Sequence, residues 1–424
     1  MYTTDKNYAK DADKNDPLRE FRNRFHIPRD KDRNEVIYLC GNSLGLQPFI
    51  TKAYVEQELE DWKNLGVEGH LHAQNPWLPY HEFLTEKTAA LAGAENEEVV
   101  NMNSLTVNLH LMMVSFYRPT NERYKILIEG NCFPSDHYAV QSQIRFHGFG
   151  VADALIEAKP REGESITRMD DILEIIDREG DKIALIMIAG VNYYSGQLFD
   201  MKGITEAGHK KGCIVGFDLA HAIGNVPLYL HDWDVDFAVW CNYKYMNGGP
   251  GAIGGAFINK KHVQDATLPK FLGWWGHDKG TRFLMDSKYI PIPTAESWQL
   301  SNPPIFQLAA LKASLDVFYE ANIEKLREKS VQLTGYMEYL INEKNKEHNN
   351  LIEIITPANP DARGCQLSLR AKENGKIMHD RLIKECVFCD WREPDVIRVA
   401  PVPLYNTFED VYCFVEILFK QEKN

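Results

Sequence analysis

The chain has 424 residues and a formal net charge of −13. This charge makes nucleic acid and anionic membrane surfaces poor partners, because both are negatively charged. Hydrophobic residues make up 44% and charged residues 25%, which is typical of a globular protein, and the longest apolar runs, such as 183–191, are too short to span a bilayer.

The length exceeds one ordinary hydrophobic core and predicts more than one domain. We expect an N-terminal arm over residues 1–50, a large domain over 51–304 and a small C-terminal domain over 305–424. The polar start of the chain is not a secretory signal. The eight cysteines lack disulfide spacing, and Cys386 and Cys389 have no second pair to complete a zinc site. We therefore expect a cytoplasmic protein without a metal.

The first structured signals lie between residues 36 and 77. An apolar strand from Val36 breaks into glycines at 41 and 45 around Ser43, which indicates a close backbone approach or a simple turn. Residues 50–65 have the spacing of an amphipathic helix. The loop that follows carries His70, either a solvated or capping residue or a contact to substrate.

Two strands are each followed by residues that suit a ligand or a helix cap. The strand 99–103 leads through Thr106 into an apolar helix, a layout that binds phosphate or forms an ordinary N-cap. The strand 125–129 leads to Phe133, which can stack on a planar ring, and to Asp136, which contacts a cofactor or caps the next helix. No glycine motif for a nucleotide is present in these turns.

The central part of the chain carries the strongest signal. Buried strands are expected at 183–189, 214–217 and 237–241, and the second and third lead directly to Asp218 and to Tyr243-Lys244. Open α/β sheets bind ligands at the carboxyl ends of their strands. Polar residues at two such ends therefore predict a site.

Asp218 and Lys244 together indicate pyridoxal 5'-phosphate (PLP). PLP enzymes need a lysine amine that attaches the cofactor and an acid that faces the pyridine nitrogen. Each residue alone has a simpler explanation, since Asp218 can cap a helix and Lys244 can be a surface lysine. Their joint occurrence at strand ends favours the cofactor.

The last third of the chain has a different pattern of predicted helices and strands. Residues 305–345 are expected to be helical, and short strands are expected at 351–355, 365–369 and 396–399. This pattern predicts a small α+β domain.

Seven motifs, in this order, resemble the kynureninase family, PLP enzymes of the aspartate-aminotransferase fold (fold type I). They are CGNSLGLQP (40–48), FPSD (133–136), GFDLAHA (216–222), WCNYKY (240–245), GWWGH (273–277), SNPP (301–304) and RVAPVPLYN (398–406). The resemblance implies an α/β fold in which helices flank a mostly parallel sheet in the large domain, beside the small C-terminal domain.

The resemblance also implies roles for single residues. Lys244 and Asp218 would be catalytic, and Arg398 would bind the substrate α-carboxylate. The residues implied to bind the cofactor are Leu105, Thr106, Phe133, Pro134, Ser135, Asp136, Asp218, His221, Tyr243, Lys244, Trp274 and Asn302. Those implied to bind substrate with Arg398 are Ser43, His70, Ser301 and Asn302. Ala189 departs from relatives that carry a hydroxyl there, which predicts one phosphate hydrogen bond fewer.

The implied reaction is hydrolytic Cβ–Cγ cleavage of L-kynurenine or 3-hydroxykynurenine, in tryptophan catabolism or NAD biosynthesis, by a homodimer with active sites at the subunit interface. Trp274 and Asn302 would reach across that interface. Three alternatives stay open: a cysteine desulfurase, for which Cys365 is the only tempting nucleophile, an aminotransferase of the same fold, and a non-catalytic PLP-binding module.

Overall fold

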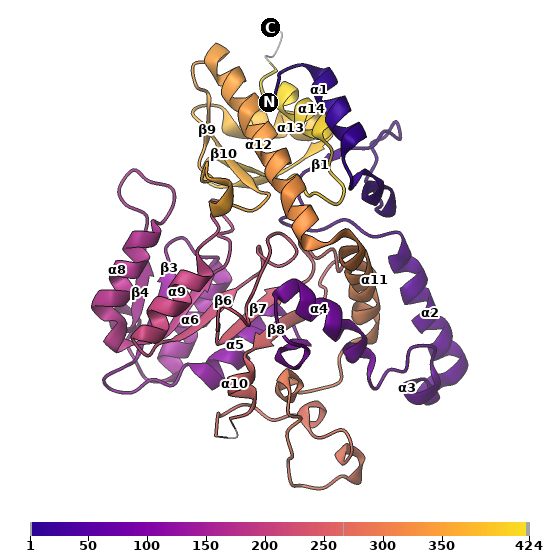
Figure 1. Ribbon diagram of the computed structural model, residues 1–424, viewed down its shortest axis with the longest axis vertical. Helices are drawn as coiled ribbons and strands as arrows, with labels where there is room; N and C mark the ends of the chain where they lie inside the picture. The colour runs from indigo at the N-terminus through magenta and orange to yellow at the C-terminus, as the bar shows by residue number, and fades with distance from the viewer. Residues whose placement is uncertain (1, 266, 421–424) are drawn as a thin grey trace.

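The computed structural model describes residues 2–265 and 267–420, which form a large region below and a smaller one above in Figure 1. A seven-stranded sheet organises the large region. Its strands, in spatial order, are β2 (Val99–Asn101), β8 (Gly254–Ile258), β7 (Phe237–Cys241), β6 (Ile214–Asp218), β5 (Ile183–Ala189), β3 (Lys125–Glu129) and β4 (Leu155–Ala158). The strands from β7 to β4 are parallel, and β8 is antiparallel to both of its neighbours.

Side chains of the sheet alternate between two cores, as the pleat of a strand requires. Leu127, Ile186 and Phe217 lie in one core, and residues next to them in the chain, such as Ile126 and Leu185, lie in the other. Helices cover both faces, which accounts for the nearly continuous apolar character of the parallel strands.

The helices of this region cover different faces of the sheet. The first core includes residues of α4 (Thr85–Ala92), α8 (Met169–Glu179), α9 (Met201–Lys210) and α11 (Ile305–Ala321). The second includes residues of α5 (Leu105–Phe116) and α6 (Pro134–Phe146). The remaining helices here are α2 (Ile50–Leu65), α3 (Gly69–His72), α7 (Val151–Ala154) and α10 (Lys260–Val263).

A four-stranded antiparallel sheet organises the smaller region. Its strands, in spatial order, are β12 (Asp390–Arg392), β13 (Val396–Val399), β10 (Leu367–Ala371) and β9 (Ile352–Ile354). The helices packed with it are α12 (Ile323–Glu347), α13 (Gly375–Lys384) and α14 (Phe408–Leu418). A separate core of buried residues lies between these helices and the sheet.

The N-terminal segment lies on this smaller region, as Figure 1 shows. Helix α1 (Lys6–Asn15) packs on α14, and β1 (Ile37–Tyr38) pairs with β11 (Val387–Phe388). The carboxylate of Asp13 accepts the N–H groups of Phe408 and Glu409 at 2.7 and 3.0 Å. An anion at this helix end is stabilised by the free N–H groups of the first turn.

Several predicted elements are confirmed with their bounds, including the helix over 50–65 and the strands over 125–129, 237–241 and 396–399. The helical stretch from 305 is two helices, because Asn322 adopts a left-handed φ of 67° between them. Buried residues of α11 belong to the core of the large sheet. The division of the chain at 50 and 304 stays a prediction.

Candidate active site

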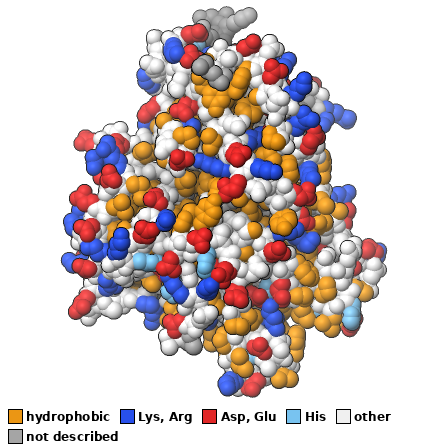
Figure 2. All heavy atoms as spheres, viewed as in Figure 1, with side chains coloured by type: hydrophobic (Ala, Val, Ile, Leu, Met, Phe, Trp, Pro, Cys, Tyr) orange, Lys and Arg blue, Asp and Glu red, His pale blue; other side chains and the backbone are white. Residues whose placement is uncertain are grey.

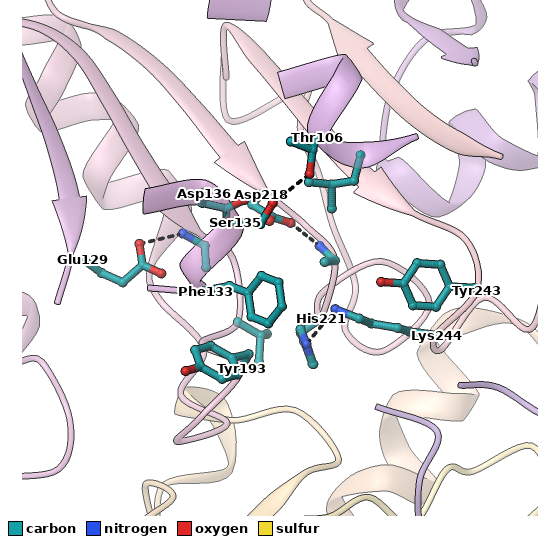
Figure 3. Close-up of a pocket in the computed structure, with 14 residues that line it drawn as sticks. Thr106, Glu129, Phe133, Ser135, Asp136, Tyr193, Asp218, His221, Tyr243 and Lys244 are labelled. Atoms are coloured by element: carbon teal, nitrogen blue, oxygen red, sulfur yellow. Dashed lines mark hydrogen bonds between the residues drawn. The ribbon is translucent and has the colours of Figure 1, made fainter. Parts of the chain in front are cut away.

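A cavity with about 500 Å³ of empty space, including space open to solvent, lies at the carboxyl ends of β5 and β6, where α5 and α6 begin. Figure 3 shows the side chains that face into it. The lining residues are Leu105, Thr106, Glu129, Phe133, Ser135, Asp136, Ala189, Val191, Tyr193, Asp218, Ala220, His221, Tyr243 and Lys244. The fold therefore brings together nine of the residues that the sequence predicts to bind a cofactor.

Two buried carboxyl groups occupy one end of the cavity. Asp218 ends β6, and its Oδ1 accepts the N–H of Ala220 at 2.6 Å. Asp136 is in the first turn of α6, and its Oδ1 is buried without a hydrogen-bond partner among the described residues. Burial, followed by the negative charge of Asp218, raises the pKa of Asp136 well above its usual range. Asp136 is therefore the member of this pair that holds a proton.

Lys244 lies in the turn after β7, and its Nζ is 2.9 Å from Nε2 of His221. Burial, followed by the positive charge of Lys244, lowers the pKa of His221 well below its ordinary value. The imidazole is consequently neutral and accepts a hydrogen bond from the ammonium group. The Nζ atom also lies 5.7 Å from the centre of the Phe133 ring, so the lysine points toward the aromatic wall seen in Figure 3.

The N-termini of α5 and α6 meet at the cavity. Thr106 and Ser135 are the second residues of these helices, and their hydroxyl oxygens are 2.9 Å apart. Neither helix is capped by a side chain of the described residues. The ordinary-cap explanation for Thr106 and Asp136 is therefore wrong, and two helix N-termini with two hydroxyl groups present a site for an anion such as phosphate.

Arg398 lies next to the cavity, behind one of its walls. It is in β13 and is 1% exposed, and it donates hydrogen bonds to the carbonyl oxygen of Tyr193 at 2.6 Å and to the carboxylate of Asp390. Its Nε is buried without a partner among the described residues. Arg398 does not line the cavity, but Tyr193 does, and the centre of its ring is 5.8 Å from the guanidinium carbon.

A simpler role for Arg398 is that of an outward-facing arginine paired with Glu393 or Asp395, but both carboxyl groups have other partners. Asp395 pairs with Arg370 at 3.1 Å, and Glu393 accepts a hydrogen bond from the indole of Trp391. The outward-facing arrangement is therefore not the one that the structure shows.

Three other predicted residues line a second, apolar groove with about 860 Å³ of empty space. His70, Trp274 and Asn302 lie there together with Val67, Glu68, Leu71, Leu78, Trp275 and Phe283. Ser43, Pro134 and Ser301 are exposed and line neither space. A single chain thus does not bring these residues to the cavity.

The glycine-rich segment around Ser43 does approach the lysine turn. The N–H of Gly45 donates to the carbonyl oxygen of Tyr243 at 2.9 Å, and a Cβ at Gly45 would collide with the carbonyl oxygen of Lys244. The close approach predicted there is therefore to backbone.

Four lining residues were missed by the sequence prediction: Glu129, Val191, Tyr193 and Ala220. A glutamate directly after the apolar run 126–128 was a usable signal, since a buried carboxyl group needs a partner. Ala189 lines the cavity and is paired in register with Asp218. The phosphate hydrogen bond expected to be missing there stays a prediction.

The overall fold is shared with solved PLP enzymes. A cysteine desulfurase from Thermococcus onnurineus superposes with a TM-score of 0.74 over 96% of each chain at 16% identity. The cystine C–S lyase C-DES superposes with a TM-score of 0.74 over 90% of this chain and 97% of its own, at 14% identity. The chain therefore has the α/β fold of the PLP-dependent enzymes of fold type I.

Sequence comparison defines the family more narrowly. Residues 326–418 match the family model of the kynureninase C-terminal domain. The kynureninase of Koribacter versatilis is 57% identical over 98% of this chain and 97% of its own length. That of Mus musculus is 48% identical over 98% of this chain and 93% of its own. This chain belongs to the kynureninase family.

Proposed function

We propose that the chain is a PLP-dependent hydrolase that cleaves the Cβ–Cγ bond of L-kynurenine or its 3-hydroxy form. Water supplies a hydroxyl group to the carbonyl carbon and a hydrogen to Cβ, so the products are an anthranilate and L-alanine. The observation that carries this proposal is the cavity that joins Lys244 with Asp218 in a chain related over nearly its whole length to kynureninases.

The residues of the cavity fit PLP end to end. Thr106 and Ser135, at two helix N-termini, suit the phosphate, and the Phe133 ring suits the face of the pyridine. At the end of the cavity that holds the buried carboxyl groups, Asp218 suits a protonated ring nitrogen. The unpartnered Oδ1 of Asp136 and Nδ1 of His221 are buried polar atoms that need a ligand partner.

Lys244 is proposed to attach the cofactor and to move protons. When bound, PLP supplies an electron-accepting ring. His221, which is neutral, receives a hydrogen bond from the lysine ammonium and so fixes the direction of Nζ. As a free amine, the form that can accept a proton, a lysine held in this direction is placed to take a proton from a neighbouring carbon, and as the ammonium it can return that proton elsewhere in the same cavity.

Arg398 is proposed to bind the substrate carboxylate through its unpartnered Nε edge. Asp390 and the Tyr193 carbonyl hold the other side of the guanidinium, which orients it in one plane. Tyr193 lines the cavity, and the centre of its ring is 5.8 Å from the guanidinium carbon, so this side chain lies close both to Arg398 and to the space proposed for the substrate.

A homodimer with shared active sites is part of the proposal. His70, Trp274 and Asn302 line a groove of their own, where Leu71, Trp274 and Phe283 are 59%, 44% and 58% exposed. Figure 2 shows apolar side chains among the charged ones on the viewed face of the molecule. Such an exposed groove suits a protein partner, and a second copy would carry these residues to the cavity of the first.

A cytoplasmic location and the three-part domain division are also part of the proposal. All eight cysteines are free of disulfides, which suits a reducing compartment. Among the described helices, none combines the length and apolar character that crossing a membrane requires. The separate core around the four-stranded sheet supports a small C-terminal domain.

The desulfurase alternative lacks a suitable nucleophile at Cys365. This cysteine is fully buried, and burial raises the pKa of its thiol to about 12, whereas reactive cysteines have lowered pKa values and exposure. One experiment distinguishes the hydrolase from the aminotransferase and non-catalytic alternatives. Protein loaded with PLP is incubated with L-kynurenine without a keto acid, and anthranilate and alanine are measured.

Equal amounts of anthranilate and L-alanine are expected. Turnover that requires an added keto acid would indicate an aminotransferase. Bound cofactor without any product from kynurenine or 3-hydroxykynurenine would contradict the hydrolase proposal and favour a binding module.

A further inference from the structure

Glu129 is a buried carboxyl group at the cavity with no role in the chemistry described above. It is the last residue of β3, is 2% exposed and lines the cavity. Its Oε2 accepts the N–H of Ala189 at 3.1 Å. Figure 3 shows Glu129 and Lys244 on opposite sides of the Asp136 and Asp218 carboxyl groups.

The hydrogen bond to Ala189 has a local cause. The β3–β5 ladder pairs residues only as far as Leu127 and Ile186, whereas β3 stays paired with β4 as far as Glu129 and Ala158. The Glu129 side chain thus replaces a ladder acceptor as β3 diverges from β5. Accepting the N–H of Ala189 requires an oxygen atom but no charge, so the side-chain oxygen of a glutamine could also accept it.

The surroundings of Glu129 make its charge consequential. Ala189, to which it bonds, is paired in register with Asp218 on β6, and Asp136 faces the same end of the cavity from α6. Burial raises the pKa of Glu129 to about 7, and the charge of Asp218 adds to the rise while the Ala189 hydrogen bond opposes it.

The other titratable groups near Glu129, Asp136 and Asp218 are uncharged or paired with an opposite charge. The Cys132 thiol, in the turn after β3, has a pKa raised by burial and by Glu129, and so is uncharged. Glu157 of β4 is paired with Lys159 at 3.2 Å and with His137 at 3.4 Å. Lys244 is the cation that acts on Asp136. The net charge of this end therefore depends on Glu129, Asp136 and Asp218.

We propose that Glu129 is a positioning residue for the cofactor. The carboxyl group of Glu129 sets the net charge of the Glu129–Asp136–Asp218 cluster, and this charge sets the affinity of the cluster for a protonated pyridine nitrogen. The inference rests on the proposed function, because it takes the ring nitrogen to lie at Asp218. When Glu129 is ionised, the cluster carries its charge in addition to that of Asp218. A positive ring nitrogen is then held more strongly than when Glu129 is protonated.

The test measures the affinity of the apoprotein for PLP at about pH 6 and about pH 8, on either side of the Glu129 titration. Wild type is compared with Glu129→Gln, which keeps the acceptor for Ala189 but cannot ionise. Because the titration of PLP itself is common to both proteins, the ratio of their dissociation constants isolates Glu129. We expect the variant to be weaker at the higher pH, with a ratio about fivefold larger than at the lower pH.

A second readout needs no cofactor. A carboxyl group whose folded pKa is raised to about 7 contributes stability below its unfolded pKa of about 4.3, and that stability is lost as the pH rises through about 7. The melting temperature of the wild-type apoprotein, compared with that of Glu129→Gln, should therefore fall from about pH 6 to about pH 8. Glu129→Asp, which keeps the charge, should retain the pH dependence of wild type.

The outcomes separate the inference from the proposed function. A ratio of dissociation constants that is the same at both pH values means that Glu129 only accepts the Ala189 hydrogen bond, and it overturns the inference alone. Wild type that binds no PLP at any pH contradicts the proposed function. If Glu129→Gln does not fold, the wild-type apoprotein still decides, because a melting temperature that does not fall from about pH 6 to about pH 8 overturns the inference.

Discussion

The cavity and the apolar groove are assembled in different ways. Asp218 and Lys244 sit at or just past the ends of neighbouring strands, so the backbone ladder of the sheet fixes their separation. His70 comes from the short helix α3, not from the loop expected there, and Trp274 comes from a one-turn 3₁₀ helix far along the chain (Trp274–Gly276). The groove that they line is apolar. Strand pairing places the cavity residues within one chain, whereas among the described residues no strand pairing connects the groove to the cavity.

This difference separates chemistry from recognition. The cavity contains the lysine, the buried carboxyl groups and the anion site at two helix N-termini. The groove contains side chains that the resemblance implies to bind the cofactor or the substrate. We infer that changes in the cavity abolish turnover at every protein concentration, and that changes in the groove act through association of two chains.

The largest effect is expected for Lys244→Ala. The variant should lose turnover by a factor of about 10²–10⁴ or more, the range for removal of a positioned proton-transfer group, and should retain no cofactor after borohydride reduction. Lys270→Ala is the control, because Lys270 is a second partly buried lysine, burial lowers its pKa to about 8, and its Nζ binds Ser297 outside the cavity. Cofactor trapped on Lys270 in wild type would refute the assignment.

Arg398→Lys should raise the KM for L-kynurenine by roughly tenfold to a hundredfold. A lysine cannot reproduce a planar, two-point contact to a carboxylate, and a hydrogen bond to a charged group contributes about 1.5–3 kcal/mol. The absorbance of bound PLP should not change. Arg370→Lys, on the paired strand β10, is the control, because Arg370 pairs with Glu353 and Asp395. Equal KM values for the two variants would mean that the carboxylate is bound elsewhere.

Asp218→Asn should bind PLP but turn over at least about tenfold more slowly, because it loses a charge-assisted hydrogen bond to the ring nitrogen. Asp236→Asn is an informative comparison at the opposite end of the sheet. Asp236 is equally buried, but its carboxylate contacts His209 and His262 at 2.9 and 2.7 Å. It should lower the melting temperature without slowing the reaction of folded protein. A rate for Asp218→Asn within twofold of wild type would show that another acid serves the ring nitrogen.

The strand-end residues could be predicted from the sequence because short apolar runs locate strands, and topology then locates their ends. Asp218 and Lys244 needed no further information. Glu129 was missed although the same reasoning applies to it, since it was taken only as the last residue of a strand. Strand β8 was hidden by its glycines. Gly255 lies against the indole of Trp240, where a Cβ would collide, so its absent side chain reflects packing rather than a loop.

The groove residues could be named by resemblance but could not be placed by pattern. Loops such as the one around Trp274 have no periodicity from which a position follows. The break at Asn322 also left no mark in the apolar spacing of the surrounding helices, because one left-handed residue redirects the chain without changing which residues are buried. Features of this kind depend on tertiary contacts, or on a second chain.

The smallest effect on activity is expected from Phe283→Asp in the groove. Phe283 is 58% exposed, and burying a phenylalanine side chain stabilises an interface by about 1.5–3 kcal/mol, so the dimer dissociation constant should rise by about tenfold or more. Sedimentation measured over a range of concentrations gives this constant directly. Activity per chain should fall when the variant is dilute and recover when it is concentrated, because the cavity itself is intact. Phe146→Asp is the matched control, since Phe146 is 78% exposed at the end of α6 and lines neither space. If wild type is monomeric and fully active at every concentration, the active site does not need a second chain. His70, Trp274 and Asn302 would then act within one chain or have no role in the reaction.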